Sequence, residues 1–170
     1  MQLIENFLPK DIFLNIQNKM LGPTMPWFHQ PHSTLDSDRT DDFYFTHNFY
    51  ADGTQRSELF QQIIHPILGH LEFNYLLRAR GRLLTIQQTQ VQHSFHVDDT
   101  IKHTVALYSV NTNNGHTLFE NGEKSYSKEN TLLIFDGSLK HATVPQTDTS
   151  VRVNINFNFT GSNFNPTDSF

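Results

Sequence analysis

Apolar residues near the start of the chain recur at helical spacing. Ile12, Ile16 and Met20 lie four residues apart between Pro9, which suits a first helical turn, and Gly22, which with the following proline ends such a turn. Residues three or four apart share one face of a helix. The pattern therefore predicts a short amphipathic helix over residues 9–21.

A second helix is expected to begin at Ser57, which suits an N-cap, and to be kinked or divided at Pro66. Between the two helices, residues 22–54 are rich in Pro, Asp, Ser, Thr and His, which predicts mostly loop with one short strand at residues 43–50. The loop is long enough to form a lid, although its aromatic residues could equally hold the loop in place. The apolar face of the second helix would comprise Phe60, Ile63, Ile64, Ile67, Leu68 and Leu71.

After Arg80-Gly81 the period of the pattern shortens to that of strands, and turn residues such as Asn113-Asn114-Gly115 and Asp136-Gly137 separate the apolar runs. We expect strands at residues 83–92, 104–110, 131–135 and 151–159. This order favours an α+β, mainly β fold, an antiparallel jelly roll or sandwich with the helices before it.

The last of these runs alternates most clearly. Side chains two residues apart on a strand share a face. One face would carry Val151, Val153, Ile155, Phe157 and Phe159, and the other would carry Arg152, Asn154, Asn156 and Asn158.

A chain of 170 residues fits one domain, which we divide into a helical part (1–81), a jelly-roll core (82–160) and a tail (161–170). The net charge of −5 argues against nucleic acid as a partner, since binding a phosphate backbone requires clustered Lys and Arg. Without cysteine, a metal site can use only N and O ligands. No apolar run approaches the roughly 20 residues of a membrane span and no leader pattern is present, so we expect a cytoplasmic protein.

Two histidine-x-acid triplets are candidates for metal binding. His70 and Glu72 fall in a helical pattern, where positions i and i+2 point apart, so they should be ordinary surface residues. His96 and Asp98 follow a strand-like run, where the two side chains share a face and can chelate one ion.

His141 is the best third ligand, because it follows an apolar run and the Asp136-Gly137 turn about forty residues later. Two histidines and one carboxylate form the facial triad of non-haem iron(II) oxygenases. The alternative explanation for His96, Asp98 and His141 is chance spacing of ordinary polar residues.

Arg152 lies on the polar face of the final predicted strand. If that face lines the site, the guanidinium points inward, and no acid lies nearby on its own strand. A ligand carboxylate held by a two-pronged contact would satisfy it. An exposed Arg152, or one paired with a distant Asp, is the alternative.

The chain resembles the 2-oxoglutarate/Fe(II)-dependent dioxygenase superfamily in the order of its candidate residues: His96-x-Asp98, then His141, then Arg152 about ten residues further. It is most similar to the short prolyl 4-hydroxylase-like members, including stand-alone phage and bacterial ones. The resemblance covers residues 83–159. It implies a double-stranded β-helix core with the helices packed outside. The chain departs from the family where Asn114-Gly115 replaces Gly-Gly and where residues 127–130 replace Pro-x-x-Gly.

The resemblance also implies cofactors and further site residues. Fe(II) would be held by the triad, 2-oxoglutarate and dioxygen would be co-substrates, and ascorbate could serve as reductant. Tyr108 would share the far carboxylate of 2-oxoglutarate with Arg152, and Gln90, on the strand before His96, would contact co-substrate or substrate. Tyr108 as a plain core aromatic and Gln90 as an ordinary polar residue are the alternatives, and His93, His103 and His116 are expected to be ordinary polar residues.

The expected reaction is hydroxylation of a C–H bond in a peptidyl, prolyl-like or small-molecule substrate, with release of succinate and carbon dioxide. Two rival hypotheses stay open. A cupin-like metal enzyme would bind metal without 2-oxoglutarate, and a non-catalytic β-sandwich binding protein would bind no metal.

Overall fold

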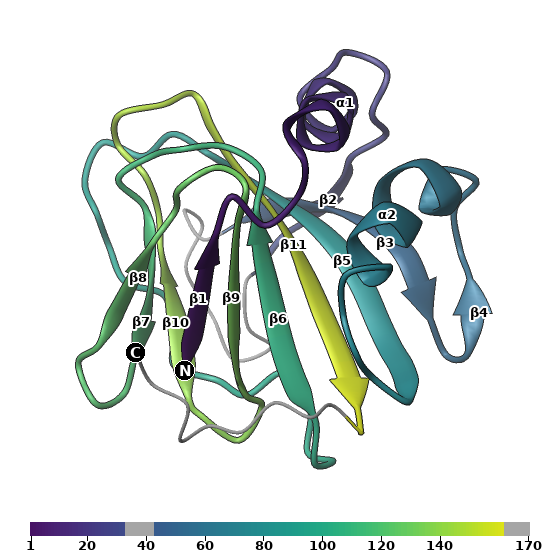
Figure 1. Cartoon of the computed structure of the whole chain (residues 1–170). Helices are drawn as coiled ribbons and strands as arrows, with labels where there is room; N and C mark the ends of the chain where they lie inside the picture. The colour runs from purple at the N-terminus through teal and green to yellow at the C-terminus, as the bar shows by residue number, and fades with distance from the viewer. Residues whose placement is uncertain (33–42, 162–170) are drawn as a thin grey trace.

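The computed structural model describes residues 1–32 and 43–161 (Figure 1). The chain contributes two helical segments and eleven strands within these ranges. In order these are β1 (Gln2–Glu5), α1 (Lys10–Met20), β2 (Phe28–Gln30), β3 (Tyr44–Ala51), β4 (Thr54–Gln55), η1 (Phe60–Ile64) leading into α2 (His65–Leu68), β5 (Tyr75–Thr85), β6 (Thr104–Ser109), β7 (His116–Phe119), β8 (Lys124–Tyr126), β9 (Thr131–Asp136), β10 (His141–Val144) and β11 (Val151–Thr160).

The strands form two antiparallel sheets. The large sheet has the order β1-β9-β6-β11-β5-β3-β2, with β4 paired to β3, and the small sheet has the order β10-β7-β8. Figure 1 shows the small sheet beside the β1 and β9 end of the large one. The predicted jelly-roll architecture, a double-stranded β-helix with helices outside it, is confirmed.

The two predicted helices are present. In α1, Phe13, Ile16 and Met20 are buried, as the spacing of apolar residues predicts. The second helical segment starts as the π-helical turn η1 and continues as α2, so it is divided next to Pro66. The Leu59 N–H donates to Ser57 Oγ at the start of this segment, which is the role expected of a capping residue.

The strand β5 differs from the prediction. It begins at Tyr75, runs through Arg80-Gly81 and ends at Thr85, so the expected strand at residues 83–92 is wrong beyond Thr85. Five strands begin before residue 82, so the first 81 residues are not a purely helical part. The period of β5 is hard to recognise in the sequence, because its apolar face in this region is formed only by Ala79 and Gly81, which alternate with long polar side chains.

Residues 22–54 also contain more strand than expected. The predicted strand at residues 43–50 is β3, and β2 and β4 lie on either side of it along the chain. The expectation that this segment forms a lid falls partly on residues 33–42, which lie outside the described residues. Among the helices that the structure describes, none is long and apolar enough to cross a membrane.

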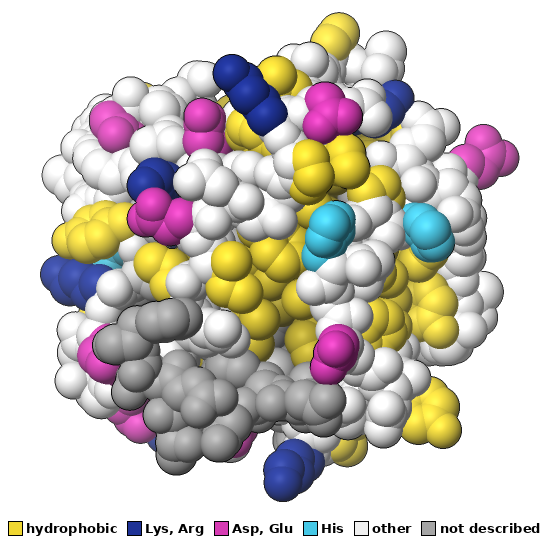
Figure 2. Space-filling view, viewed as in Figure 1, with side chains coloured by type: hydrophobic (Ala, Val, Ile, Leu, Met, Phe, Trp, Pro, Cys, Tyr) yellow, Lys and Arg dark blue, Asp and Glu magenta, His cyan; other side chains and the backbone are white. Residues whose placement is uncertain are grey.

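The two faces of the large sheet are covered differently. On one face, Ile155 and Phe157 of β11 belong to the main core, which includes Ile16 of α1 and Ile63 and Ile67 of the second helical segment. Figure 2 shows the molecule from the side of these helices, with hydrophobic side chains gathered over the middle of the large sheet. The opposite face looks toward the small sheet, and its half nearest β9 is filled by a second apolar cluster of Val105, Phe119, Leu133 and Phe135.

Candidate metal centre

Backbone hydrogen bonds hold His96 beside His141. The His96 N–H donates to His141 O and the His141 N–H donates to His96 O, both at 3.0 Å, which makes an isolated antiparallel bridge. Their rings lie 4.8 Å apart between centroids. His141 begins β10, whereas His96 lies in the segment between β5 and β6, so the bridge joins two parts of the chain that are distant in sequence.

Both imidazoles are oriented by main-chain carbonyls two residues earlier. Nδ1 of His96 lies 3.2 Å from Ser94 O, and Nδ1 of His141 lies 3.0 Å from Leu139 O. A carbonyl oxygen accepts a hydrogen bond from a protonated Nδ1, and in that tautomer Nε2 has its lone pair available for a metal. Burial, with a smaller contribution from His141, lowers the pKa of His96 and favours the neutral imidazole that coordination requires.

Asp98 is held by donors on the floor of the site. Its Oδ2 accepts hydrogen bonds from Nδ2 of Asn156 at 2.8 Å and of Asn158 at 3.0 Å, while Oδ1 lies 3.3 Å from the Arg78 guanidinium. Burial alone would raise the pKa of Asp98, but Arg78, the two amides and His141 outweigh burial and hold this pKa well below its usual range. The carboxylate is therefore ionised at neutral pH.

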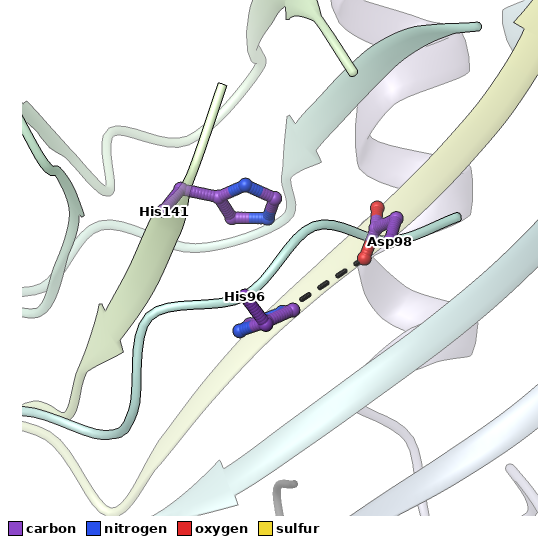
Figure 3. A group of neighbouring side chains, drawn as sticks. All are labelled: His96, Asp98 and His141. Atoms are coloured by element: carbon purple, nitrogen blue, oxygen red, sulfur yellow. Dashed lines mark ion pairs between the residues drawn. The ribbon is translucent and has the colours of Figure 1, made fainter. Parts of the chain in front are cut away.

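The three side chains converge on one point (Figure 3). One candidate ligand atom from each residue lies within 4.8 Å of the other two, and Oδ1 of Asp98 is 3.9 Å from Nε2 of His96. Two imidazoles and one ionised carboxylate suit an iron(II) ion that keeps open positions for other ligands. His96 and Asp98 line a cleft of about 810 Å³, so a bound ion would be accessible to small molecules.

Arg152 lies deeper in the molecule than the cleft. It is only 2% exposed, and its Nη1 donates to His116 O at 3.2 Å and to Val144 O at 3.1 Å. Its Nε is buried without a hydrogen-bond partner in the described part of the chain. Burial lowers the pKa of Arg152 to about 9, with a further contribution from nearby Arg82, so the guanidinium is still charged at neutral pH.

Gly115 makes room for that side chain. A Cβ at this position would lie 3.0 Å from Cδ of Arg152 and 2.9 Å from Oδ1 of Asn113. The glycine that matches the second Gly of the family pattern is thus needed for close approach rather than for an unusual φ. Of the two expected departures, Asn130 adopts a φ of +52° where relatives often have Gly, whereas Asn114 does not take a positive φ.

The expected role of Tyr108 needs correction. Tyr108 pairs with Ile155 across β6 and β11, so it faces the helices, on the opposite side of the sheet from Arg152. Its hydroxyl donates to Oδ1 of Asn130 at 3.0 Å, and burial raises its pKa above the usual range. A side chain in this position cannot share a carboxylate with Arg152.

Gln90 is also placed differently from the expectation. It does not lie on a strand, because β5 ends at Thr85, and it is exposed. Its Nε2 donates to Asn114 O at 2.8 Å, which fits an ordinary loop contact. His103 and His116 are buried and are not part of the cluster of candidate ligands; His103 Nδ1 lies near Ile101 O, and His116 packs on Tyr126.

Sequence reasoning missed three arginines that line the cleft together with His96 and Asp98, namely Arg78, Arg80 and Arg82. They occupy alternate positions of β5, with Ala79 and Gly81 between them. The sequence shows the alternation as Arg-x-Arg-x-Arg, but the change of period after Arg80-Gly81 predicts a boundary between elements at this point. A period of two across these five residues is the signal that could have identified them.

Comparisons with solved structures show what the fold resembles. A prolyl hydroxylase from Trichoplax adhaerens, in complex with a hypoxia inducible factor oxygen degradation domain peptide fragment, is 13% identical and has a TM-score of 0.67 over 94% of this chain and 82% of that chain. A 2OG-Fe(II) oxygenase family oxidoreductase from Burkholderia pseudomallei is 7% identical, with a TM-score of 0.65 over 93% and 84% of the two chains. The viral collagen prolyl hydroxylase of Paramecium Bursaria Chlorella virus-1, as a 2OG complex, is 12% identical, with a TM-score of 0.56 over 95% and 96%.

No protein-family model matches the sequence, and no curated protein matches it. At these identities, the structural likeness establishes the fold. The chain has the double-stranded β-helix fold that is also seen in these oxygenase and prolyl hydroxylase structures.

Proposed function

We propose that this chain is a 2-oxoglutarate- and Fe(II)-dependent dioxygenase that hydroxylates a C–H bond of a peptidyl, prolyl-like or small-molecule substrate. The observation that carries the proposal is the convergence of His96, Asp98 and His141 at an open cleft, with Nδ1 of each histidine beside a main-chain carbonyl. The shared fold supports it independently.

In this proposal, His96, Asp98 and His141 hold the iron. Bound Fe(II) supplies the redox chemistry, in which one oxygen atom of dioxygen enters the substrate and the other enters succinate as 2-oxoglutarate loses carbon dioxide. Ascorbate would serve only to keep the iron reduced. The protein contributes geometry, because the backbone bridge sets the two histidines and the asparagine amides fix Asp98.

Arg152 is the proposed partner of the far carboxylate of 2-oxoglutarate. Its Nη1 donates to His116 O and Val144 O, which are neutral carbonyls, so these contacts orient the guanidinium without neutralising its charge. A buried cation is costly unless an anion accompanies it. A carboxylate arriving from the metal side would supply that charge, with the guanidinium preorganised for two parallel hydrogen bonds.

The cleft and the neighbours support a peptide or small-molecule substrate. The Trichoplax protein is a prolyl hydroxylase seen with a peptide fragment, and the viral neighbour is a collagen prolyl hydroxylase. A cleft of about 810 Å³ has room for a peptide segment or a small molecule beside the triad.

An anaerobic titration tests this function directly. The apo-protein is titrated with Fe(II) and then with 2-oxoglutarate, while the visible charge-transfer band of the chelate is recorded. We expect saturation near one equivalent of each, and we expect Arg152→Ala to weaken 2-oxoglutarate binding by about a hundredfold, as for loss of a buried charge-assisted contact.

The same titration separates the rivals. Metal binding without the band would replace the proposal with a cupin-like metal enzyme, and no metal binding would favour a binding protein. Unchanged 2-oxoglutarate affinity in Arg152→Ala would place the far carboxylate elsewhere. Arg56→Ala is the control, because Arg56 is paired with Asp52 on the surface, outside the residues that line the cleft.

A further inference from the structure

The floor of the cleft is a ladder of arginine and asparagine side chains. On β5 and β11, three arginines lie directly opposite three asparagines: Arg82 pairs with Asn154, Arg80 with Asn156, and Arg78 with Asn158. Directly paired residues of antiparallel strands project to the same side of the sheet. All three arginines therefore share the cleft face with the asparagines that hold Asp98.

The three guanidiniums have different partners. Within the described residues, the structure pairs Arg78 with a carboxylate, that of Asp98. Arg80 donates through Nε to the neutral amide oxygen of Asn48 at 2.7 Å, and the Arg82 guanidinium lies 4.3 Å from the centroid of the Tyr44 ring. Nε of Arg82 is buried without a hydrogen-bond partner in the same part of the chain.

Among the residues that the structure describes, the cleft is therefore lined by three arginines and one aspartate, an excess of positive charge in a protein whose net charge is −5. Like charges at this spacing repel, and burial together with Arg78 and Arg82 lowers the pKa of Arg80. A divalent iron and a doubly charged 2-oxoglutarate would cancel each other, so the proposed cofactors would not remove the excess.

Arg80 and Arg82 are also distinct from the proposed co-substrate contact. Arg152 pairs with Leu84, one row beyond Arg82 on the same face, and does not line the cleft. Arg80 and Arg82 line the cleft itself, with Tyr44 on β3 forming part of its wall. A molecule entering the cleft would meet them next to the triad.

We propose that the substrate carries an anionic group, a carboxylate or a phosphate, which Arg80 and Arg82 bind while the carbon to be hydroxylated lies at the metal centre. This inference rests on the proposed function and specifies its substrate class. Guanidinium groups suit both anions, because their paired N–H donors match two oxygens. Binding through the anion would fix the position of the substrate along the ladder.

Nuclear relaxation near a paramagnetic ion tests the inference without a known substrate. The protein is loaded with Mn(II) and saturated with 2-oxoglutarate, and the longitudinal relaxation of ³¹P in inorganic phosphate and of ¹³C in labelled acetate is measured. Protein loaded with Zn(II) gives the diamagnetic reference. We expect faster relaxation of at least one anion, and the anion affected identifies phosphate or carboxylate as the preferred group.

Substitutions assign the effect to the arginines. Arg82→Gln should weaken anion binding by about tenfold, as for loss of one charge-assisted contact, and Arg80→Gln should act in the same direction. Arg82→Lys keeps the charge but loses the fork and should lose less affinity. Arg56→Gln is the matched control, because it removes one surface charge outside the residues that line the cleft.

The outcomes separate this inference from the proposed function. If Mn(II) and 2-oxoglutarate bind but neither anion relaxes faster than in the Zn(II) reference, the anion subsite is wrong and the proposed function stands. Relaxation unchanged by Arg82→Gln and Arg80→Gln, in variants that still bind Mn(II), also overturns it. A protein that takes up no Mn(II) overturns the proposed function and the inference together.

Discussion

Alternate residues of β11 form its two faces, and the two faces have different roles: one stabilises the fold and the other faces the cleft. Val153, Ile155 and Phe157 are buried in the core beneath the helices, where apolar burial stabilises the fold. The cleft face concentrates buried polar atoms without partners in the described part of the chain: Nε of Arg78, Arg82 and Arg152, and Oδ1 of Asn154, Asn156 and Asn158.

Each such atom costs about 1–3 kcal/mol of stability when no ligand or water satisfies it. Burial of the apolar face therefore offsets the free-energy cost of the unpaired polar atoms on the cleft face, which is typical of a strand that forms a binding site. The comparison predicts that substitutions on the cleft face change binding and turnover, while those on the helix face change stability.

The largest expected effect on activity follows from His141→Ala. We expect loss of stoichiometric metal binding and of succinate formation, because the triad loses one ligand. The fold should remain, since the bridge to His96 uses main-chain atoms. Metal titration and thermal unfolding measure the two effects, and His65→Ala is the control, because His65 of α2 is exposed. Undiminished turnover would remove His141 from the ligand set.

Phe157→Ala should give the reverse result. Phe157 is fully buried beneath the helices, and truncation of such a side chain lowers the free energy of unfolding by about 3–5 kcal/mol. Turnover per folded molecule should stay near wild type, because Phe157 does not face the cleft. Urea unfolding followed by assay at low temperature measures both quantities. A loss of turnover larger than the loss of folded protein would contradict the division between the faces.

Asn158→Ala should weaken metal binding by about 10–100-fold, the usual effect of removing a residue that orients a ligand. The variant removes one of the two amide hydrogen bonds to Oδ2 of Asp98. Asn154→Ala is a matched control on the same face, since no hydrogen bond joins Asn154 to Asp98. Metal titration of both variants gives the comparison, and equal losses would show that Asn158 does not act through Asp98.

Tyr108→Phe should have the smallest effect. It removes the hydrogen bond to Asn130, which contributes about 1 kcal/mol to stability, and it leaves the far side of the sheet unchanged. The apparent affinity for 2-oxoglutarate should therefore match wild type. A raised 2-oxoglutarate requirement would return Tyr108 to the co-substrate site and contradict its assignment to the helix face.

The candidate ligands could be found in the sequence because their spacing carries the information. His96 and Asp98 lie two residues apart, and β11 alternates without interruption. These are local properties, and the structure brings His96, Asp98 and His141 together and buries Arg152 as the pattern suggested. Their roles as ligands and as a carboxylate contact stay predictions for the experiments above.

Other features depended on contacts between distant segments. The face on which Tyr108 lies is set by its pairing with Ile155, and the loop position of Gln90 is set by where β5 ends. Spacing alone gives no register between strands, and a shift of one residue moves a side chain to the opposite face.

The sequence by itself determined three strands of the second half (β6, β9 and β11), the two helices and the residue types able to hold an N- and O-liganded metal, because periodicity and side-chain chemistry are local. Only the tertiary structure decided that Arg78, Arg80 and Arg82 lie opposite the asparagines of β11 and line the cleft at Asp98. That arrangement arises from hydrogen-bonded pairing between strands some seventy residues apart, which no local pattern specifies.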